Sequence, residues 1–276
     1  MPLALVDRNP TVQEVERIRL ILSTYQDGTG MLVDKKNPGM TLPGWRDFER
    51  SVALAFNGRA QESKYVFDVI LTDRDKRDIH YGISCKMRSE LNRIDRDGRV
   101  TIELSNSLGK FWGHLNTKAI YTSNYRDKPE IVGSGLLELV EQWYLAESIE
   151  TKGKVDLTKS SYLVLSWNKA GWYQLHQFPL AFPDPSSLVW YSPTKFVKGS
   201  EKISRRIIGN DSEGTLFEWY GESGGQLKYY PFESASIWKS DRFRLEPLGD
   251  IEHGILAKAA AYFPEQWKFA SQDSID

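Results

Sequence analysis

Two charged residues stand inside runs of apolar residues, where a charge is costly unless it is paired. Asp68 lies in the run Tyr65–Leu71, and Lys86 lies near the end of Tyr81–Met87. Because side chains alternate along a strand, Ser84 and Lys86 share one face of the second run. An acid and a lysine that converge in this way can form a structural ion pair. They can also hold a metal ion and position a water molecule for hydrolysis.

The convergence of the two runs depends on how they pair. The charged stretch between them, residues 72–78, predicts a hairpin that turns near Lys76. With that turn Asp68 falls opposite Ser84 and diagonal to Lys86, within reach of a long side chain. A shift of one residue would move Asp68 to the opposite face, so this register is an assumption of the prediction.

Further carboxylates could complete such a site. In a helix predicted at Trp45–Phe56, Glu49 falls on the apolar stripe, whereas Asp47 is expected to face solvent. A carboxylate on an apolar stripe indicates either an ion pair or a metal ligand. Glu103, in a β-branched run, is the next candidate. Glu90 is a weaker one because it follows the lysine run so closely.

Positioning these residues requires strands covered by helices. Strand patterns predict Lys64–Leu71, Tyr81–Arg88 and Arg99–Leu104, and from about Val155 short aromatic and β-branched runs alternate with turn residues. We expect an α/β fold with a mixed central β-sheet flanked by helices and a β-rich C-terminal elaboration. We expect a core with N-terminal helices at residues 1–150 and a β-rich region at residues 151–276, either as two domains or as two parts of one domain. Four other helices are predicted. The first begins at Pro10 with Asn9 as its cap, and the others cover Ser107–Leu115, Pro129–Ser148 and Ile251–Tyr262.

The composition narrows the class of protein. With 40% hydrophobic and 26% charged residues, the chain is typical of a globular protein, and its net charge of −1 excludes a wholly basic nucleic-acid coat protein. A local basic groove remains possible. The single cysteine, Cys85, excludes an internal disulfide and a zinc cluster and fits a reducing cytoplasm. We expect a cytoplasmic protein, since neither a signal peptide nor a membrane span is present in the sequence.

The order of these features resembles the core of the PD-(D/E)xK nucleases. A helix with Glu, a strand with Asp, a hairpin and a strand ending in x-x-Lys follow one another, and the likeness covers about residues 40–120. It is most similar to type II restriction endonucleases. Phe67 replaces the usual proline, and Ser84 stands where an acid usually precedes Lys86 by two positions. A subset of similar restriction enzymes has Ser-x-Lys and takes the missing acid from elsewhere in the chain.

The resemblance implies roles for the candidate residues. Asp68, completed by Glu49 or Glu103, would hold Mg²⁺, with Mn²⁺ as a possible substitute. Lys86 would orient the attacking water, and Ser84 would hydrogen-bond to a water of the metal shell. The implied reaction is hydrolysis of double-stranded DNA at a short specific sequence, leaving 5′-phosphate and 3′-hydroxyl ends. A homodimer would match a palindromic site, and a companion DNA methyltransferase would act on the same sequence.

Residues that could contact DNA lie in two places. The most basic stretch, residues 195–206, offers Lys198 and Lys202 for phosphates and Arg205 or Arg206 for bases, although a solvated loop would explain it equally. The second place is the start of the short helix near residue 107, where a helix N-terminus could bind phosphate. The candidates there are Asn106 and Lys110.

Two other functions remain open. One is a repair or recombination nuclease that has the same active site but is non-specific or selects DNA by structure. The other is a non-enzymatic binding module in which Asp68 and Lys86 form a structural pair and the Trp and Tyr side chains of residues 162–238 are exposed as a binding surface. The four histidines have no metal-binding spacing and are expected to be structural.

Overall fold

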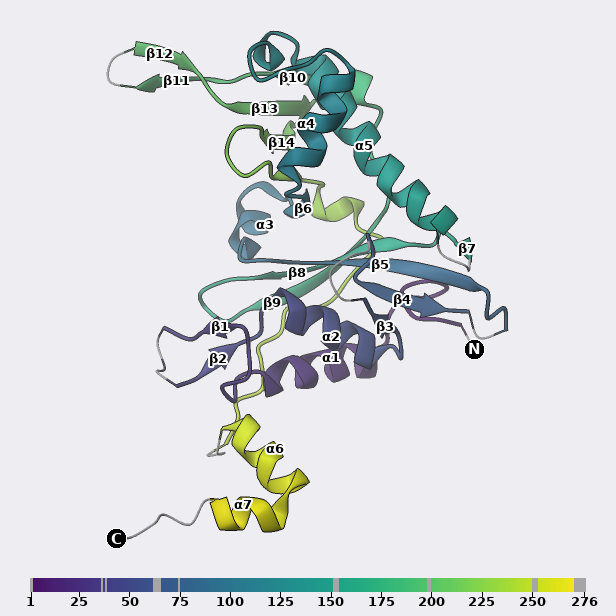
Figure 1. The fold of residues 1–276 in the computed structure, drawn as a ribbon, viewed down its shortest axis with the longest axis vertical. Helices are drawn as coiled ribbons and strands as arrows, with labels where there is room; N and C mark the ends of the chain where they lie inside the picture. The colour runs from purple at the N-terminus through teal and green to yellow at the C-terminus, as the bar shows by residue number, and fades with distance from the viewer. Residues whose placement is uncertain are drawn as a thin grey trace.

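The computed structural model describes residues 2–35, 37, 39–61, 66–73, 75–150, 154–197, 200–249 and 253–270. Two main β-sheets lie one above the other, with helices on their faces (Figure 1). The predicted α/β class, with a mixed sheet flanked by helices, is therefore confirmed. Within these residues, no helix combines the length and the apolar character that crossing a membrane requires.

The first sheet has seven strands and is built around β5 (Ile79–Arg88). β5 pairs antiparallel with β4 (Val69–Thr72) and parallel with β8 (Ser161–Trp167), which makes the sheet mixed. The middle of β5, residues 81–85, is buried. The remaining strands are β3 (Arg59–Ala60), β7 (Lys154–Val155), β9 (Tyr173–Pro179) and β16 (Trp238–Lys239).

Helices α1 (Val12–Thr24) and α2 (Trp45–Ala55) cover one face of this sheet (Figure 1). The predicted start of α1 at Pro10, capped by Asn9, is wrong. Thr11 is the cap: its hydroxyl accepts a hydrogen bond from the Glu14 amide, and the Glu14 carboxylate accepts one from the Thr11 amide. This reciprocal pair satisfies two amides that the helix leaves unpaired. On the sheet side, apolar residues of both helices meet β4, β5 and β8, among them Ile18, Leu22, Phe48, Val52, Val69, Ile83 and Leu163.

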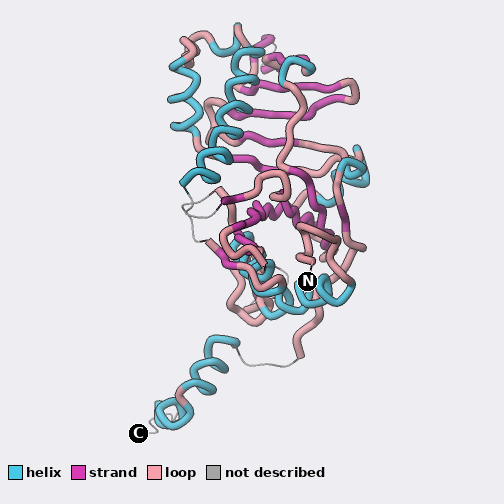
Figure 2. Tube along the Cα trace, turned by 90° about the vertical axis from the view of Figure 1, so that its right-hand side faces the viewer, coloured by secondary structure: helices cyan, strands magenta, loops and turns pink. Residues whose placement is uncertain are grey.

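The second sheet is antiparallel, in the order β10–β13–β14–β15–β6. Helices α4 (Leu108–Thr117) and α5 (Pro129–Glu150) lie along one face of it (Figure 2). β6 comes from the first half of the chain and its partner β15 from the second, so both sheets combine strands from either side of residue 150. The strands are β6 (Ile102–Ser105), β10 (Val189–Tyr191), β13 (Arg206–Asp211), β14 (Gly214–Tyr220) and β15 (Leu227–Tyr229).

Aromatic residues of the C-terminal half fill the core between these layers. Tyr162, Trp190 and Trp219 are almost completely buried. The exposed aromatic surface required by a non-enzymatic binding module is therefore wrong for these three residues. Their rings pack against α4, α5 and the second sheet instead.

The remaining elements are short. The predicted last helix is observed as α6 (Gly254–Tyr262), while α3 (Leu91–Asp97) and α7 (Pro264–Ala270) were not predicted. In α3, the apolar Leu91 and Ile94 are buried among polar neighbours, a pattern too short to reveal a helix. The other short elements are the hairpins β1 (Leu32–Val33) with β2 (Thr41–Leu42) and β11 (Thr194–Val197) with β12 (Ser200–Ile203), and the 3₁₀ turns at Tyr125–Asp127, Pro185–Ser187 and Glu233–Ala235.

Candidate active site

The pairing of β4 with β5 places Asp68 where the hairpin prediction put it. Val69 pairs with Ile83, and the amide of Asp68 donates to the carbonyl of Ile83 at 3.1 Å. Extending this register by one residue sets Asp68 opposite Ser84, so the predicted register is confirmed. Strand β4 itself begins at Val69 rather than at Lys64, and residues 62–65 lie outside the described part of the chain.

The surrounding hydrogen-bond donors all lie near one carboxylate oxygen of Asp68. Oδ2 accepts from the Cys85 amide at 2.7 Å, lies 3.4 Å from the Ser84 hydroxyl oxygen and 3.5 Å from Lys86 Nζ. The shortest of these contacts comes from a backbone amide, so β5 itself orients the carboxylate. The expected convergence of Asp68, Ser84 and Lys86 is therefore observed.

Lys86 carries its charge at neutral pH. Burial is the largest single effect and lowers the pKa of its ammonium, but the interactions with Asp68, Tyr144, Cys85 and Glu49 together outweigh burial, so the pKa lies above its usual value. A lysine in this state stabilises negative charge and donates hydrogen bonds, but it does not accept a proton. This property defines what Lys86 can contribute to chemistry.

Glu49 on α2 is partly buried beside the same strand. Burial and the nearby charge of Asp68 raise the pKa of Glu49 from 4.5 to about 7, and Lys86 only partly offsets them. Two carboxylates held close enough to repel each other are stabilised by a bound cation. Glu49, which was predicted from its place on the apolar stripe of the helix, therefore lies in the same site as Asp68 and Lys86.

One cavity of about 780 Å³ joins these residues to others from distant parts of the chain. Its walls come from α2, the start of β4, β5, β6, and helices α4 and α5. A volume of this size is typical of ligand sites. The predicted residues that line it are Glu49, Asp68, Ser84, Lys86, Glu103, Asn106 and Lys110.

Glu103 faces the cavity and is paired there with Arg88. Its Oε2 accepts from Arg88 Nη1 at 2.7 Å. In the described part of the chain, no group of three or more His, Cys, Asp and Glu side chains is arranged to hold a metal ion. Asp68 and Glu49, whose charges repel each other, are the carboxylates of the cavity that could hold a cation. This donor set fits Mg²⁺, which binds through one or two carboxylates and keeps several waters.

The basic stretch predicted to contact DNA lies away from this cavity. Arg205 pairs with Glu222 at 3.1 Å, and Arg206 pairs with the buried Glu218. Lys202 is exposed on β12, in a hairpin that projects from the body (Figure 1). Lys198 lies outside the described residues. DNA contact by these side chains stays a prediction, and both arginines already have acidic partners.

Sequence reasoning misplaced one residue and missed two. Asp47 is buried rather than solvent-facing, because its carboxylate accepts from the amides of Met31 and Gly44 and so fixes the start of α2. Arg88 and Tyr144 also line the cavity. Arg88 could have been found, since it continues the alternation that places Ser84 and Lys86 on one face. Tyr144 reaches the site only through tertiary packing.

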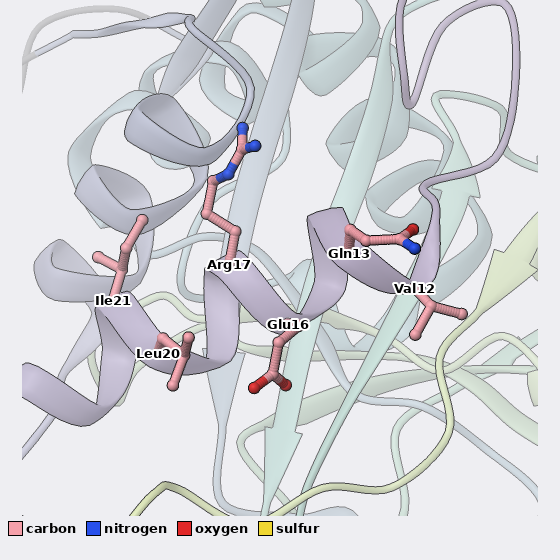
Figure 3. A pocket seen from close by; sticks show the side chains of 6 residues that line it. All are labelled: Val12, Gln13, Glu16, Arg17, Leu20 and Ile21. Carbon is pink, nitrogen blue, oxygen red and sulfur yellow. The ribbon is translucent and has the colours of Figure 1, made fainter.

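A second surface hollow, of about 420 Å³, lies on the outer side of α1 (Figure 3). Its charged side chains are already engaged: Glu16 pairs with Arg19 at 2.7 Å, and Arg17 donates to the Ala55 carbonyl at 3.1 Å. This surface offers no reactive group. It is lined by Val12, Gln13, Glu16, Arg17, Leu20 and Ile21.

Comparison with known proteins found no matching family model, no matching curated protein and no matching solved structure. A functional proposal for this chain therefore depends on its own residues and their geometry.

Proposed function

We propose that the chain is a Mg²⁺-dependent endodeoxyribonuclease with a restriction-endonuclease-like core, acting on double-stranded DNA at a short specific sequence. The observation that supports it most is the shared cavity. Asp68, Glu49 and Lys86 come from three separate elements and converge on one hollow together with Asn106 and Lys110. The order of the sequence motif predicts that Asp68, Glu49 and Lys86 act together. Their convergence on one cavity favours a functional site over an isolated ion pair.

Each residue has a role that follows from its chemistry. Asp68 and Glu49 would hold the cation, which when bound polarises a phosphate and lowers the pKa of a water. Lys86, charged at neutral pH, orients the attacking water by hydrogen bonding and offsets the negative charge that develops on the phosphate. Ser84 is buried next to Asp68 and supports the carboxylate.

The cavity also offers groups for the DNA backbone. Asn106 and Lys110 flank the N-terminus of α4, where the amides of the first turn favour a phosphate. Because Lys110 lies within the same hollow as Asp68, a strand bound there would pass the carboxylates. We propose this arrangement in preference to contacts by Arg205 and Arg206, which have acidic partners.

Recognition of a palindromic site would require two copies related by a two-fold axis. We therefore propose a homodimer, and a companion DNA methyltransferase that modifies the same sequence. The second candidate function, a non-specific or structure-selective nuclease, uses the same catalytic residues, and the cleavage products separate the two.

The test is digestion of phage and plasmid DNA by the purified protein with EDTA, Mg²⁺ or Mn²⁺. The Lys86→Ala variant is assayed beside it, with Lys258→Ala on the exposed surface of α6 as the matched control. Discrete fragments that require both the metal and Lys86 would support the site-specific enzyme. A smear with the same requirements would support the non-specific nuclease. If intact DNA remains under every condition, the proposal is wrong and Asp68–Lys86 is a structural pair.

A further inference from the structure

Strand β5 ends in another polar residue on the face of Ser84 and Lys86. Arg88 follows Lys86 by two positions, so its side chain leaves the same side of the strand. It lines both the main cavity and a neighbouring hollow of about 260 Å³, called here the outer hollow, and Trp45 and Met87 also line both. Glu90 lines the outer hollow as well. The two spaces thus adjoin at the end of the catalytic strand.

Arg88 and Glu90 form a long salt bridge without a hydrogen bond. Arg88 Nε lies 3.6 Å from Glu90 Oε2, which is too long for a hydrogen bond. Both atoms are buried, and neither has a hydrogen-bond partner among the described residues. Glu103 holds Nη1 of the same guanidinium at 2.7 Å and so fixes its orientation. The rest of the two side chains is open to the outer hollow, since Arg88 is 24% and Glu90 36% exposed, so a ligand there can supply an acceptor to the guanidinium and a donor to the carboxylate.

A G·C base pair has the complementary edge. In the major groove guanine presents two acceptors, N7 and O6, and cytosine presents the N4 amino donor. An arginine beside a glutamate offers donors to the first and an acceptor to the second. An A·T pair presents a donor between two acceptors, which this pair of side chains matches less well.

We propose that Arg88 and Glu90 are specificity-determining residues that read a G·C pair close to the cleaved bond, an inference that rests on the proposed nuclease function. Two residues of extended strand span about 6.6 Å, and successive base pairs are about 3.4 Å apart. The G·C pair therefore lies within about two base pairs of the phosphate held beside Lys86. Glu103 is a positioning residue for Arg88 rather than a metal ligand.

The experiment starts from the cut sequence of the wild-type enzyme, read from its fragment ends. Duplex oligonucleotides then carry each of the four base pairs at every position of that sequence. They are cleaved by wild type, Arg88→Lys, Glu90→Gln and the control Arg96→Ala, whose side chain is 72% exposed. We expect discrimination at a single G·C position near the cut to fall by about 5- to 150-fold in the first two variants. The other positions and the control keep wild-type selectivity.

Binding of the same duplexes to the Lys86→Ala variant, with and without Arg88→Lys, gives a second readout that does not require cleavage. Loss of selectivity at one position in both assays supports the proposal. A recognition sequence without G·C near the cut, or an equal loss at every position, overturns it and leaves Arg88 as part of a structural ion pair. Failure of wild type to cut any DNA is seen before a variant is made and counts against the nuclease function itself.

Discussion

The substitution Glu49→Gln is expected to stabilise the protein at alkaline pH and to abolish the proposed cleavage of DNA. The folded state raises the pKa of Glu49 from 4.5 to about 7, so it binds the proton more tightly than the unfolded chain does. The stabilisation from the neutral carboxyl is complete below about pH 4.5. It is lost as the pH rises to about 7, where Glu49 ionises beside Asp68. A glutamine keeps the neutral form at every pH.

The size of the effect follows from the two pKa values. Their difference corresponds to about 3 kcal/mol at most. Because the side chain of Glu49 is partly in contact with solvent, screening reduces this, and we expect about 1–2 kcal/mol above pH 7.5. For a chain of this length the gain corresponds to an increase in Tm of roughly 2–8 °C.

The measurement is thermal unfolding of wild type and Glu49→Gln in EDTA, from pH 4.5 to 8.5, with Glu141→Gln on the exposed side of α5 as the control. The difference in Tm should be small at pH 4.5, grow through pH 6 and level off above pH 7.5. An equal difference at all pH values, or no gain at pH 8, would refute the assigned repulsion between Glu49 and Asp68. Addition of Mg²⁺ should stabilise wild type more than the variant.

Three further predictions concern other parts of the molecule. Asp68→Asn should keep the fold but abolish both cleavage of DNA and the stabilisation of the protein by Mg²⁺. At a hundredfold excess of Mg²⁺ over its Kd, this stabilisation is worth about 2.7 kcal/mol in wild type. Thermal unfolding with and without Mg²⁺ measures the stabilisation, and an unfolded variant would favour the structural ion pair. Arg206→Ala should lower the free energy of unfolding by about 2 kcal/mol, because the buried Glu218 loses its charged partner. Arg205→Ala, at an exposed position, should leave the free energy of unfolding unchanged. Loss of DNA binding by Arg206→Ala without loss of stability would instead support base contact by Arg206. Gly133→Ala should destabilise the protein by about 1–3 kcal/mol in urea unfolding, since the added Cβ would lie 2.2 Å from the Trp190 ring. In the control Gly113→Ala the added Cβ meets no atom within 4 Å, so this variant should be as stable as wild type or more stable.

The parts of the site that the sequence predicts are those set by local rules. Strand alternation and a short charged hairpin were enough to pair Asp68 with Ser84 and Lys86, and helical periodicity was enough to single out Glu49. These patterns have short range, so the order of residues determines them. Glu103 also reached the cavity as expected, but its pairing with Arg88 depends on the approach of β6 to β5, which no local pattern encodes.

The parts that the sequence did not predict depend on tertiary contacts. Asp47 looks solvent-facing by helical periodicity, yet the loop before α2 folds over it and donates two amides to its carboxylate. In the sequence, the aromatic residues of the C-terminal half suggest an exposed binding surface. In the structure, Trp190 and Trp219 are buried in the core formed by the second sheet and α5. Strand pattern alone does not distinguish a buried ring from an exposed one.

The pairing of β6 with β15 has a consequence for how the protein is made. One wall of the cavity, with Glu103, is the edge strand of a sheet whose other strands lie after residue 188. β8, which pairs with β5, also follows the residues of the candidate site in the chain. During synthesis, Asp68 and Lys86 leave the ribosome long before the strands that hold them in place. A truncated product would carry every reactive side chain and still lack the assembled cavity. Assembly of the cavity therefore requires the C-terminal half of the chain to be complete.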